Sequence, residues 1–438
     1  MQFGTDGVRG RANTELTASF ALDLGRAAAR VLDARIAVVG GDSRRSTAML
    51  EAAFVAGLAS EGVEVHRMGV TPTPAVAFEA ARLGAMGAVI SASHNAYFDN
   101  GIKLFAQGGT KLPDEVESRI EAALSTLGTS SREPAAIHGR GDASGAYVDH
   151  LMTVLEGRRL DGLRVVVDAA NGAASHLVSE VFQRTGAAVT VINAQPNGIN
   201  INDRCGATDP AGLQTVVNAE RAHVGIALDG DADRLIAVDD RGDVVDGDHI
   251  MAICATDLSE RGMLHDNTVV VTVMTNLGFH HAMREAGIEV VETGVGDRYV
   301  LEALAAGGYS LGGEQSGHVI FTKLATTGDG LLTALVLLDV VQRSGRRLSQ
   351  LASEAMTQLP QVLVNVRLAE QRLDVAELLV SEIAEAAEPL GSTGRILVRP
   401  SGTEPLVRVM VEAPTADLAQ SIADHLAAVV RAHPDLST

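Results

Sequence analysis

Three segments of the chain repeat one order of predicted elements, and this repetition limits the possible folds more than any other feature. Each segment opens with an apolar run that breaks into a turn of small residues. The three runs are Ile36-Ala-Val-Val-Gly40, Val165-Val-Val-Asp168 and Val269-Val-Val-Thr-Val273. An alanine-containing stretch typical of a helix follows each run. The repetition predicts three related units built from alternating strands and helices.

Each unit continues through two further predicted strands. The second strands begin near a glycine or alanine, at residues 62–65, 187–192 and 287–291. The third segments end in polar loops, at residues 87–95, 224–234 and 309–318. The order β-α-β-α-β therefore occurs three times, although a similar rhythm is found in any α/β protein.

The apolar strand runs also indicate where a ligand binds. Continuous apolar runs are typical of strands that are covered on both faces. Ligands of such sheets bind beyond the carboxyl ends of the strands. We therefore expect the three polar loops after the third strands to be three faces of one site.

The chain has 438 residues, and this length alone predicts about three domains. Predicted junctions lie at residues 127–145, rich in Gly and Ser, and at residues 239–248. After Pro360 the pattern changes to an imperfect strand alternation at Val362, Val364 and Val366. Residues Leu418, Ile422, Leu426 and Val429 follow the spacing of an amphipathic helix.

The predicted fold class is α/β, with three related mixed-sheet βαβ-type domains and a smaller C-terminal α+β domain. The predicted domains are residues 1–145, 146–245, 246–359 and 360–438.

Composition excludes several classes of partner. The net charge is −20 and no Lys/Arg-rich run occurs, so no nucleic-acid partner is expected. No uninterrupted apolar stretch reaches about 18 residues, so no membrane span is expected. The N-terminus lacks a signal-peptide pattern. Cys205 and Cys254 have no metal or redox spacing, which favours free buried thiols in a reducing cytoplasm.

Asp229, Asp231 and Asp233 alternate after the apolar run 224–228. An EF-hand loop also spaces acids in this way, but it requires glycine at its sixth position and glutamate at its twelfth. Arg234 and Asp240 occupy those positions, and the flanks are typical of strands. Three carboxylates this close repel one another unless a cation lies among them, which favours Mg²⁺. A solvated acidic turn is the alternative.

Ser93 lies in the loop Ser91-Ala-Ser-His-Asn95 and is a candidate nucleophile. A helix N-cap is the alternative interpretation. The chain has neither the Gly-x-Ser-x-Gly elbow of esterases nor a Walker-A loop. Phosphoryl transfer without a nucleotide loop indicates a phosphate carried on the protein itself.

The glycine-bounded loop 312–318 supplies three polar side chains. Glu314 and Ser316 are candidates for binding sugar hydroxyls. His318 is a candidate for donating to phosphate or for moving a proton. An ordinary tight turn is the alternative.

A proline-bounded loop, Arg399-Pro-Ser-Gly-Thr-Glu-Pro405, follows the apolar run 396–398. Arginine, two hydroxyls and free backbone amides are suited to holding phosphate. Arg408 lies one strand further on, and a simple turn is again the alternative.

Five motifs together make the chain similar to the α-D-phosphohexomutases over essentially its whole length. They stand in that family's order, namely Gly4-Thr-Asp-Gly-Val-Arg9-Gly10, Ser91-Ala-Ser-His-Asn95, Asp229-Gly-Asp-Ala-Asp-Arg234, Gly313-Glu-Gln-Ser-Gly-His318 and Arg399-Pro-Ser-Gly-Thr-Glu-Pro405. The segment 314–316, with the opening motif, resembles the bacterial phosphoglucosamine mutases. Phosphomannomutase/phosphoglucomutase relatives typically have methionine in place of Gln315.

The resemblance implies four domains around a central cleft, and a role for each matching residue. Ser93 would carry phosphate as phosphoserine, and Asp229, Asp231, Asp233 and that phosphate would hold one Mg²⁺. Arg9, Lys103 and Arg234 would assist the transferring group, and the loop 294–298 would contact substrate. The remaining substrate-binding residues would be Glu314, Ser316, His318, Arg399, Ser401, Gly402, Thr403 and Arg408. Lys103 and His318 both stay candidates for the general base.

The implied reaction converts glucosamine 6-phosphate reversibly to glucosamine 1-phosphate through a 1,6-bisphosphate, which would also act as activator. Its product would feed UDP-N-acetylglucosamine and cell-wall precursor synthesis. The expected partner is a small sugar phosphate, and the formation of a homodimer is left as an open alternative. The alternatives are a phosphomannomutase/phosphoglucomutase, an inactive sugar-phosphate sensor and a phosphatase. One departure is Ala96, where relatives usually have proline, so this loop lacks the stiffness that proline provides.

Overall fold

The computed structural model describes residues 3–4, 6–139, 144–368, 370–372, 374–400, 405–433 and 436. The chain divides into two compact units. The larger unit runs to Met274 and resumes at Gly287–Ala355. The smaller unit contains Thr275–Ala286 and the chain from Met356 onward.

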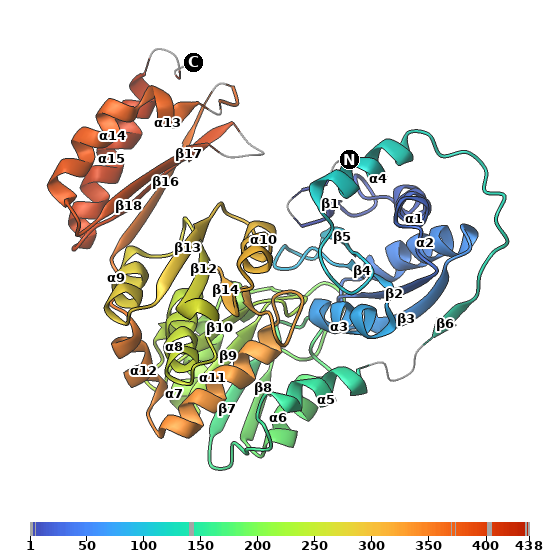
Figure 1. The fold of residues 1–438 in the computed structure, drawn as a ribbon, viewed down its shortest axis with the longest axis horizontal. Helices are drawn as coiled ribbons and strands as arrows, with labels where there is room; N and C mark the ends of the chain where they lie inside the picture. Colours follow the sequence, from blue (N-terminus) through green and yellow to red (C-terminus); the bar gives the residue numbers. More distant parts are fainter. Residues whose placement is uncertain are drawn as a thin grey trace. The chain divides into compact units, whose positions relative to one another are not determined.

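The larger unit contains three mixed sheets (Figure 1). The first has the order β1-β5-β4-β2-β3-β6. Its strands are β1 (Val8–Arg11), β2 (Ile36–Gly41), β3 (Glu64–Val70), β4 (Met86–Ile90), β5 (Asp99–Phe105) and β6 (Ile137–Gly139). The second has the order β11-β10-β9-β7-β8, with β7 (Arg164–Asp168), β8 (Ala188–Ile192), β9 (Val224–Leu228), β10 (Leu235–Val238) and β11 (Val244–Val245). The third has the order β13-β12-β14-β15, with β12 (Thr268–Thr272), β13 (Glu289–Thr293), β14 (Leu311–Gly313) and β15 (Val319–Phe321).

These sheets confirm the predicted threefold repetition. In each, the first predicted strand lies between the second and the third and is parallel to both. A further strand then returns antiparallel beside the third, as β5, β10 and β15 do. This return makes each sheet mixed, and it turns the polar loop after the third strand into a tight connection between neighbouring strands.

Helices connect the strands of each sheet (Figure 1). Those of the larger unit are α1 (Ala18–Leu32), α2 (Thr47–Ser60), α3 (Thr73–Leu83), α4 (Asp114–Leu124), α5 (Gly145–Thr153), α6 (Val178–Thr185), α7 (Ala211–Glu220), α8 (Gly247–Glu260), α10 (Asp297–Gly307), α11 (Gly330–Ser344) and α12 (Leu348–Ala355). Side-chain caps begin several of them: Thr17 accepts from Phe20 N–H, and Asp329 accepts from Leu332 N–H. Such caps satisfy backbone donors that a helix leaves free at its start.

The predicted junctions contain short edge strands. β6 lies inside the segment 127–145 and pairs in parallel with β3. β11 lies inside the segment 239–248 and pairs with β10. Both segments therefore add to the sheet that precedes them, because even a short extended stretch can pair with a free strand edge.

The smaller unit is built on an antiparallel sheet with the order β16-β18-β17, where β16 is Gln361–Arg367, β17 is Arg395–Pro400 and β18 is Leu406–Glu412. Its helices are α9 (Leu277–Glu285), α13 (Val375–Leu378), α14 (Val380–Ala387) and α15 (Ala416–Ala432). The predicted strand after Pro360 and the predicted terminal helix are both confirmed. Helix α15 buries Ile422 and Leu426 against the core of this unit.

Helix α9 belongs to the smaller unit although its sequence lies between β12 and β13. Leu277 N–H donates to Glu412 Oε2 across 2.9 Å, and the side-chain amide of Asn276 donates to the Leu359 carbonyl across 2.9 Å. These bonds tie the start of α9 to β18 and to the chain just before β16. No local pattern in the sequence records this grouping.

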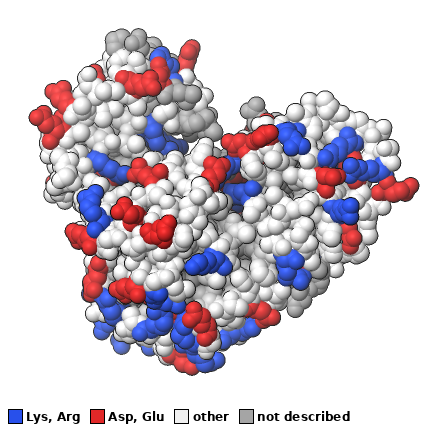
Figure 2. Space-filling model, viewed as in Figure 1, with Lys and Arg blue, Asp and Glu red and all other residues white. Residues whose placement is uncertain are grey.

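Charged side chains of both signs are interspersed on the face drawn in Figure 2. Among the described residues, no helix is both long and apolar enough to cross a membrane. Lys103, Arg9 and Arg234 lie in the larger unit, close to buried or partly buried carboxylates.

Candidate active site

The three predicted polar loops meet in the larger unit. Ser93 follows β4, the three aspartates follow β9, and His318 follows β14. Ser93 Oγ donates to Asp229 Oδ2 across 2.6 Å, and His318 Nδ1 lies 3.7 Å from Asp233 Oδ2. The expectation that these loops share one site is confirmed, because the carboxyl ends of equivalent strands converge there.

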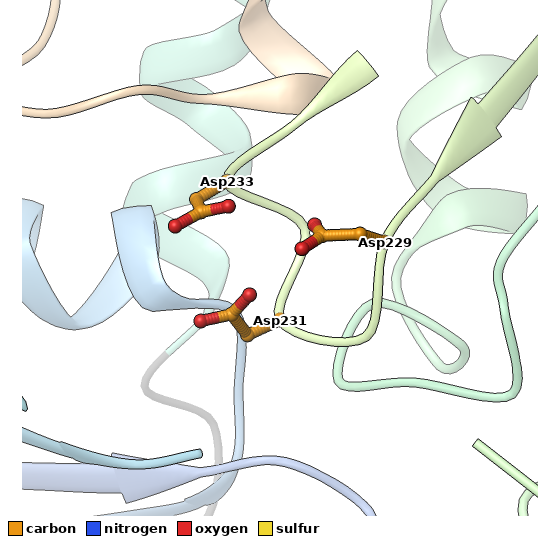
Figure 3. A group of neighbouring side chains, drawn as sticks. All are labelled: Asp229, Asp231 and Asp233. Carbon is orange, nitrogen blue, oxygen red and sulfur yellow. The ribbon is translucent and has the colours of Figure 1, made fainter. Parts of the chain in front are cut away.

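Asp229, Asp231 and Asp233 form a compact carboxylate cluster on the turn between β9 and β10 (Figure 3). One oxygen of each lies within 4.8 Å of the others, and all three residues are buried. Asp231 Oδ1 and Asp233 Oδ1 have no hydrogen-bond partner among the described residues. Buried carboxylate oxygens without partners are costly unless a cation binds them. The cluster therefore fits a divalent metal ion that prefers oxygen ligands.

The electrostatics of the cluster support this fit. Burial, together with the neighbouring Asp233 and Asp231, raises the pKa of Asp229 well above its usual range. Burial also opposes ionisation of Asp233, but Lys103, His318 and Arg234 together outweigh it and hold the pKa of Asp233 well below its usual range. The raised pKa of Asp229 shows that a third negative charge in the cluster is unfavourable without a further cation.

Lys103, on β5, supplies the central positive charge. Its Nζ lies 2.8 Å from Asp231 Oδ2, 3.1 Å from Asp233 Oδ2 and 2.8 Å from Asp6 Oδ2. Burial lowers the pKa of Lys103, but the three carboxylates outweigh it and raise that pKa well above its usual range. An ammonium group has three N–H donors, and here each has a carboxylate within reach.

Arg9 and Arg234, the two arginines expected to assist the transferring group, lie at the same site. Arg9, on β1, donates to Asp6 Oδ2 across 2.5 Å. Arg234 Nε lies 3.8 Å from Asp233 Oδ1, and the backbone N–H of Arg234 donates to Asp229 Oδ1 across 3.3 Å. Both side chains stay partly exposed, so both are accessible to an anionic ligand.

Ser93 is buried and has a positive φ of 50°. A non-glycine residue in this left-handed region costs about 1–2 kcal/mol. His94 Nδ1 lies 3.3 Å from Ser93 Oγ. Burial and the neighbouring Arg234 and Arg9 lower the pKa of His94 to about 4, so His94 is neutral at neutral pH. Its contact with Ser93 Oγ is therefore a local hydrogen bond of a neutral ring.

His318 is buried between two carboxylates. Its Nδ1 faces Asp233, and its Nε2 accepts from Gly328 N–H at 3.1 Å and lies 3.4 Å from Asp297 Oδ2. Burial lowers the pKa of His318, but Asp233 and Asp297 outweigh it and raise that pKa above its usual value. The two carboxylates therefore favour the protonated ring and place His318 to hold a proton.

Two further polar side chains at this site were not predicted from the sequence. Lys111 Nζ donates to Asp6 Oδ1 across 2.7 Å and also pairs with Asp297. Thr73 Oγ1, at the start of α3, donates to Asp231 Oδ2 across 2.7 Å. The one available signal was the rarity of lysine: the chain has only Lys103, Lys111 and Lys323, and two of these lie at the site.

The loop 294–298 and the loop 312–318 are joined by a hydrogen bond from Gly296 N–H to Glu314 Oε1 across 3.1 Å. Arg298 pairs with Glu117 across 2.6 Å and with Asp114, both on α4. Ser316 is exposed on its loop. These contacts hold the loop 294–298 beside Glu314 and α4.

In the smaller unit, Arg399 on β17 and Arg408 on β18 are directly paired across the sheet. Burial and Arg408 lower the pKa of Arg399, and Arg399 Nε is buried without a hydrogen-bond partner among the described residues. Like charges opposite each other destabilise a sheet. The pair therefore fits an anion such as phosphate. Ser401, Gly402 and Thr403 lie outside the described residues.

Comparison with protein families covers most of the chain. The four models of the phosphoglucomutase/phosphomannomutase family match in order: alpha/beta/alpha domain I at residues 1–130, domain II at 145–242, domain III at 246–359 and the C-terminal domain at 363–429.

Full-length relatives and solved structures agree with this assignment. A phosphoglucosamine mutase of Rhodococcus opacus is 54% identical over 440 residues, covering 98% of both chains. One of Frankia casuarinae is 56% identical over 447 residues, also covering 98% of both. A phosphoglucomutase/phosphomannomutase family protein of Burkholderia thailandensis shares the fold, with a TM-score of 0.81, 24% identity and 99% and 98% coverage. An N-acetylphosphoglucosamine mutase of Aspergillus fumigatus, solved with GlcNAc-6P and magnesium, has a TM-score of 0.70, 20% identity and 98% and 95% coverage. The chain belongs to the phosphoglucomutase/phosphomannomutase family of α-D-phosphohexomutases.

Proposed function

We propose that the chain is an isomerase that interconverts glucosamine 6-phosphate and glucosamine 1-phosphate by phosphoryl transfer through Ser93. The hydrogen bond between Ser93 Oγ and Asp229 is the observation that carries the proposal, because it places a hydroxyl at a buried carboxylate cluster. The phosphoglucosamine mutase names of the relatives that are 53–56% identical favour glucosamine as the sugar.

The reaction has two transfers. In the first, the bond between phosphorus and Ser93 Oγ breaks, the phosphoryl group bonds to the 1-hydroxyl of the sugar, whose proton passes to a base of the enzyme, and Ser93 Oγ takes up a proton. The resulting 1,6-bisphosphate reorients within the site. In the second, the bond between phosphorus and O6 breaks, the phosphoryl group returns to Ser93 Oγ, which gives up its proton, and O6 takes up a proton. A sugar 1,6-bisphosphate would also phosphorylate resting enzyme and so act as its activator.

The aspartates would hold Mg²⁺ together with the phosphate on Ser93. Bound there, the ion would neutralise charge on the transferring phosphoryl group. Three aspartates and a phosphoserine carry about −5 in charge. Lys103, Arg9 and Arg234 with one divalent ion balance that charge, and all three side chains lie around the cluster.

The proposal assigns different roles to the two candidate bases. Lys103 directs its N–H groups at three carboxylates, so we assign it to charge balance. His318 lies beside the carboxylates of Asp233 and Asp297, which stabilise its protonated ring, so we assign it to proton transfer. Glu314 and Ser316 would bind sugar hydroxyls. Arg399 and Arg408, with residues 401–403, would hold the phosphate that is not reacting.

Two further expectations belong to the proposal. Cys205 and Cys254 are free and buried, which suits the reducing cytoplasm. The partner is a sugar phosphate, with no nucleic acid or membrane.

The decisive experiment is Ser93→Ala, assayed on glucosamine 6-phosphate with added sugar bisphosphate. We expect wild type to convert glucosamine 6-phosphate and to carry one phosphoryl group on Ser93, as measured by intact mass. The variant should show neither the activity nor the added mass. Full activity in the variant would overturn it. Wild type that never accepts phosphate from a bisphosphate would instead favour the sugar-phosphate sensor.

The choice of sugar is tested separately. Comparative kcat/KM values for the 6-phosphates of glucosamine, glucose and mannose should rank glucosamine first. A higher value for glucose or mannose would favour the phosphomannomutase/phosphoglucomutase alternative.

A further inference from the structure

The carbonyl oxygens of Ser93 and Asn95 are held from two sides. Arg44 Nη2 donates to the Ser93 carbonyl across 3.1 Å and also to the Asn95 carbonyl. Asn202 Nδ2 donates to the same two carbonyls, across 2.9 Å and 3.3 Å. Arg44 follows β2 of the first sheet and Asn202 follows β8 of the second. Two donors occupy both lone pairs of the Ser93 carbonyl.

Arg44 is itself fixed in place. Its side chain is fully buried and pairs with Asp42. Asp42 Oδ1 accepts from Thr47 Oγ1 across 2.9 Å, and Asp42 Oδ2 accepts from Ser91 Oγ across 2.6 Å. Ser91 Oγ in turn accepts from the Ser93 N–H across 2.9 Å. One network therefore holds both the N–H and the carbonyl of Ser93.

This network explains how Ser93 keeps its left-handed backbone. A non-glycine residue stays at a φ of 50° only where its surroundings over-determine that conformation. Gly230 also packs closely against the Ser93 backbone, since a Cβ at Gly230 would lie 2.6 Å from the Ser93 carbonyl oxygen. The backbone held in this way fixes the position of Ser93 Cβ, from which Oγ reaches Asp229.

We propose that Arg44 and Asn202 are positioning residues for the phosphoryl transfer: by holding the carbonyls of Ser93 and Asn95 they keep Ser93 Oγ aimed at the carboxylate cluster. This inference rests on the proposed function, because positioning has a kinetic consequence only if Ser93 carries the phosphoryl group. The network takes the place of the backbone stiffness that proline at position 96 would provide, since Ala96 leaves φ free.

The primary test is Asn202→Gly, because Asn202 is only half-buried, glycine adopts its left-handed φ of 57° without strain, and loss of the amide leaves the Arg44–Asp42 pair intact. The expected result is a fall in kcat of about ten- to a hundredfold with KM for glucosamine 6-phosphate nearly unchanged, since small displacements of a reacting group have such effects. Arg44→Lys is the second variant. It keeps a cation for Asp42 but lacks the planar guanidinium group that reaches both carbonyls. The same fall in kcat with a nearly unchanged KM is therefore expected.

Controls separate positioning from stability. Asn197→Ala removes an exposed amide from the same segment that does not contact Ser93, and its kcat should equal that of wild type. Ala96→Pro added to Asn202→Gly should restore part of the lost kcat without changing KM. A partial rescue of this kind has no explanation in a purely structural role.

The inference would be overturned if wild type is active and both variants keep its kcat, whether or not their melting temperatures fall. Failure of the proposed function is recognised differently, because wild type would then neither turn over nor carry phosphate on Ser93.

Discussion

Ser93 Oγ and Asp229 Oδ2 lie 2.6 Å apart although 136 residues separate them in the chain. The contact joins the loop after β4 of the first sheet to the loop after β9 of the second. A phosphoryl group on Ser93 would therefore extend from a point that already touches the candidate metal cluster. This relationship makes the metal-binding role of Asp229 directly testable.

Asp229→Asn should separate metal binding from folding. In metal-free protein the amide removes repulsion with Asp231 and Asp233, keeps an oxygen that accepts from Arg234 N–H and has an NH2 that can donate to Ser93 Oγ, so the melting temperature should equal or exceed that of wild type. Added Mg²⁺ should stabilise wild type by about 2.7 kcal/mol at a hundredfold excess over Kd, and the variant far less. Differential scanning calorimetry measures both effects, with the exposed Asp203→Asn as control. Equal shifts in variant and wild type would refute the metal site.

Lys111→Met should destabilise the protein strongly. Lys111 lies between Asp6 and Asp297, and its loss leaves two largely buried carboxylates without their shared cation. Breaking a buried pair in this way costs about 3–5 kcal/mol. Urea unfolding of Lys111→Met, Asp297→Asn and the double variant should show that the second change recovers part of the loss.

The third lysine provides the control for this cycle. Lys323 is exposed, and Lys323→Met should change the free energy of unfolding by less than about 0.5 kcal/mol. A similar loss in both lysine variants would contradict the role assigned to Lys111.

Asp329 should make stability depend on pH. Burial raises its pKa to about 7, although Leu332 N–H and the Tyr147 hydroxyl both donate to it. The folded protein therefore binds this proton more tightly than the unfolded chain, whose Asp pKa is about 3.9. The resulting stabilisation is complete below about pH 4 and is lost as pH rises to about 7.

The matched variant is Asp329→Asn, which keeps a helix cap. Relative to this variant, wild type should lose up to about 4 kcal/mol in free energy of unfolding between about pH 4 and pH 8. Urea unfolding across that range measures the difference. Parallel pH curves for the two proteins would show that Asp329 titrates normally.

Gly57→Ala should destabilise the packing of α1 against α2. A Cβ at Gly57 would lie 2.1 Å from the Leu22 carbonyl oxygen, so the helices would have to separate. Overpacking of this kind costs about 1–3 kcal/mol. Gly212→Ala in α7 is the control, because a Cβ there meets nothing within 4 Å and alanine favours the helix. In thermal unfolding, the melting temperature should fall for Gly57→Ala and rise for Gly212→Ala.

Much of the fold could be predicted from local patterns. The runs beginning at Val165 and Val269 became the central strands β7 and β12, because continuous apolar stretches of this length have few other stable environments. Repetition of the pattern then placed Ser93, Asp229 and His318 after equivalent strands. The aspartate cluster could also be predicted, since alternate residues of one short turn stay close whatever surrounds them.

Only the tertiary structure decided which distant groups meet. The grouping of α9 with the smaller unit, the Lys111–Asp297 pair and the hold of Arg44 and Asn202 on the Ser93 carbonyl all join segments far apart in the chain. Such contacts depend on strand order, register and backbone direction, and no local periodicity records these. The sequence by itself therefore determined the repeated α/β units and their polar loops, while three-dimensional packing determined how Ser93 is aimed and which charges balance around it.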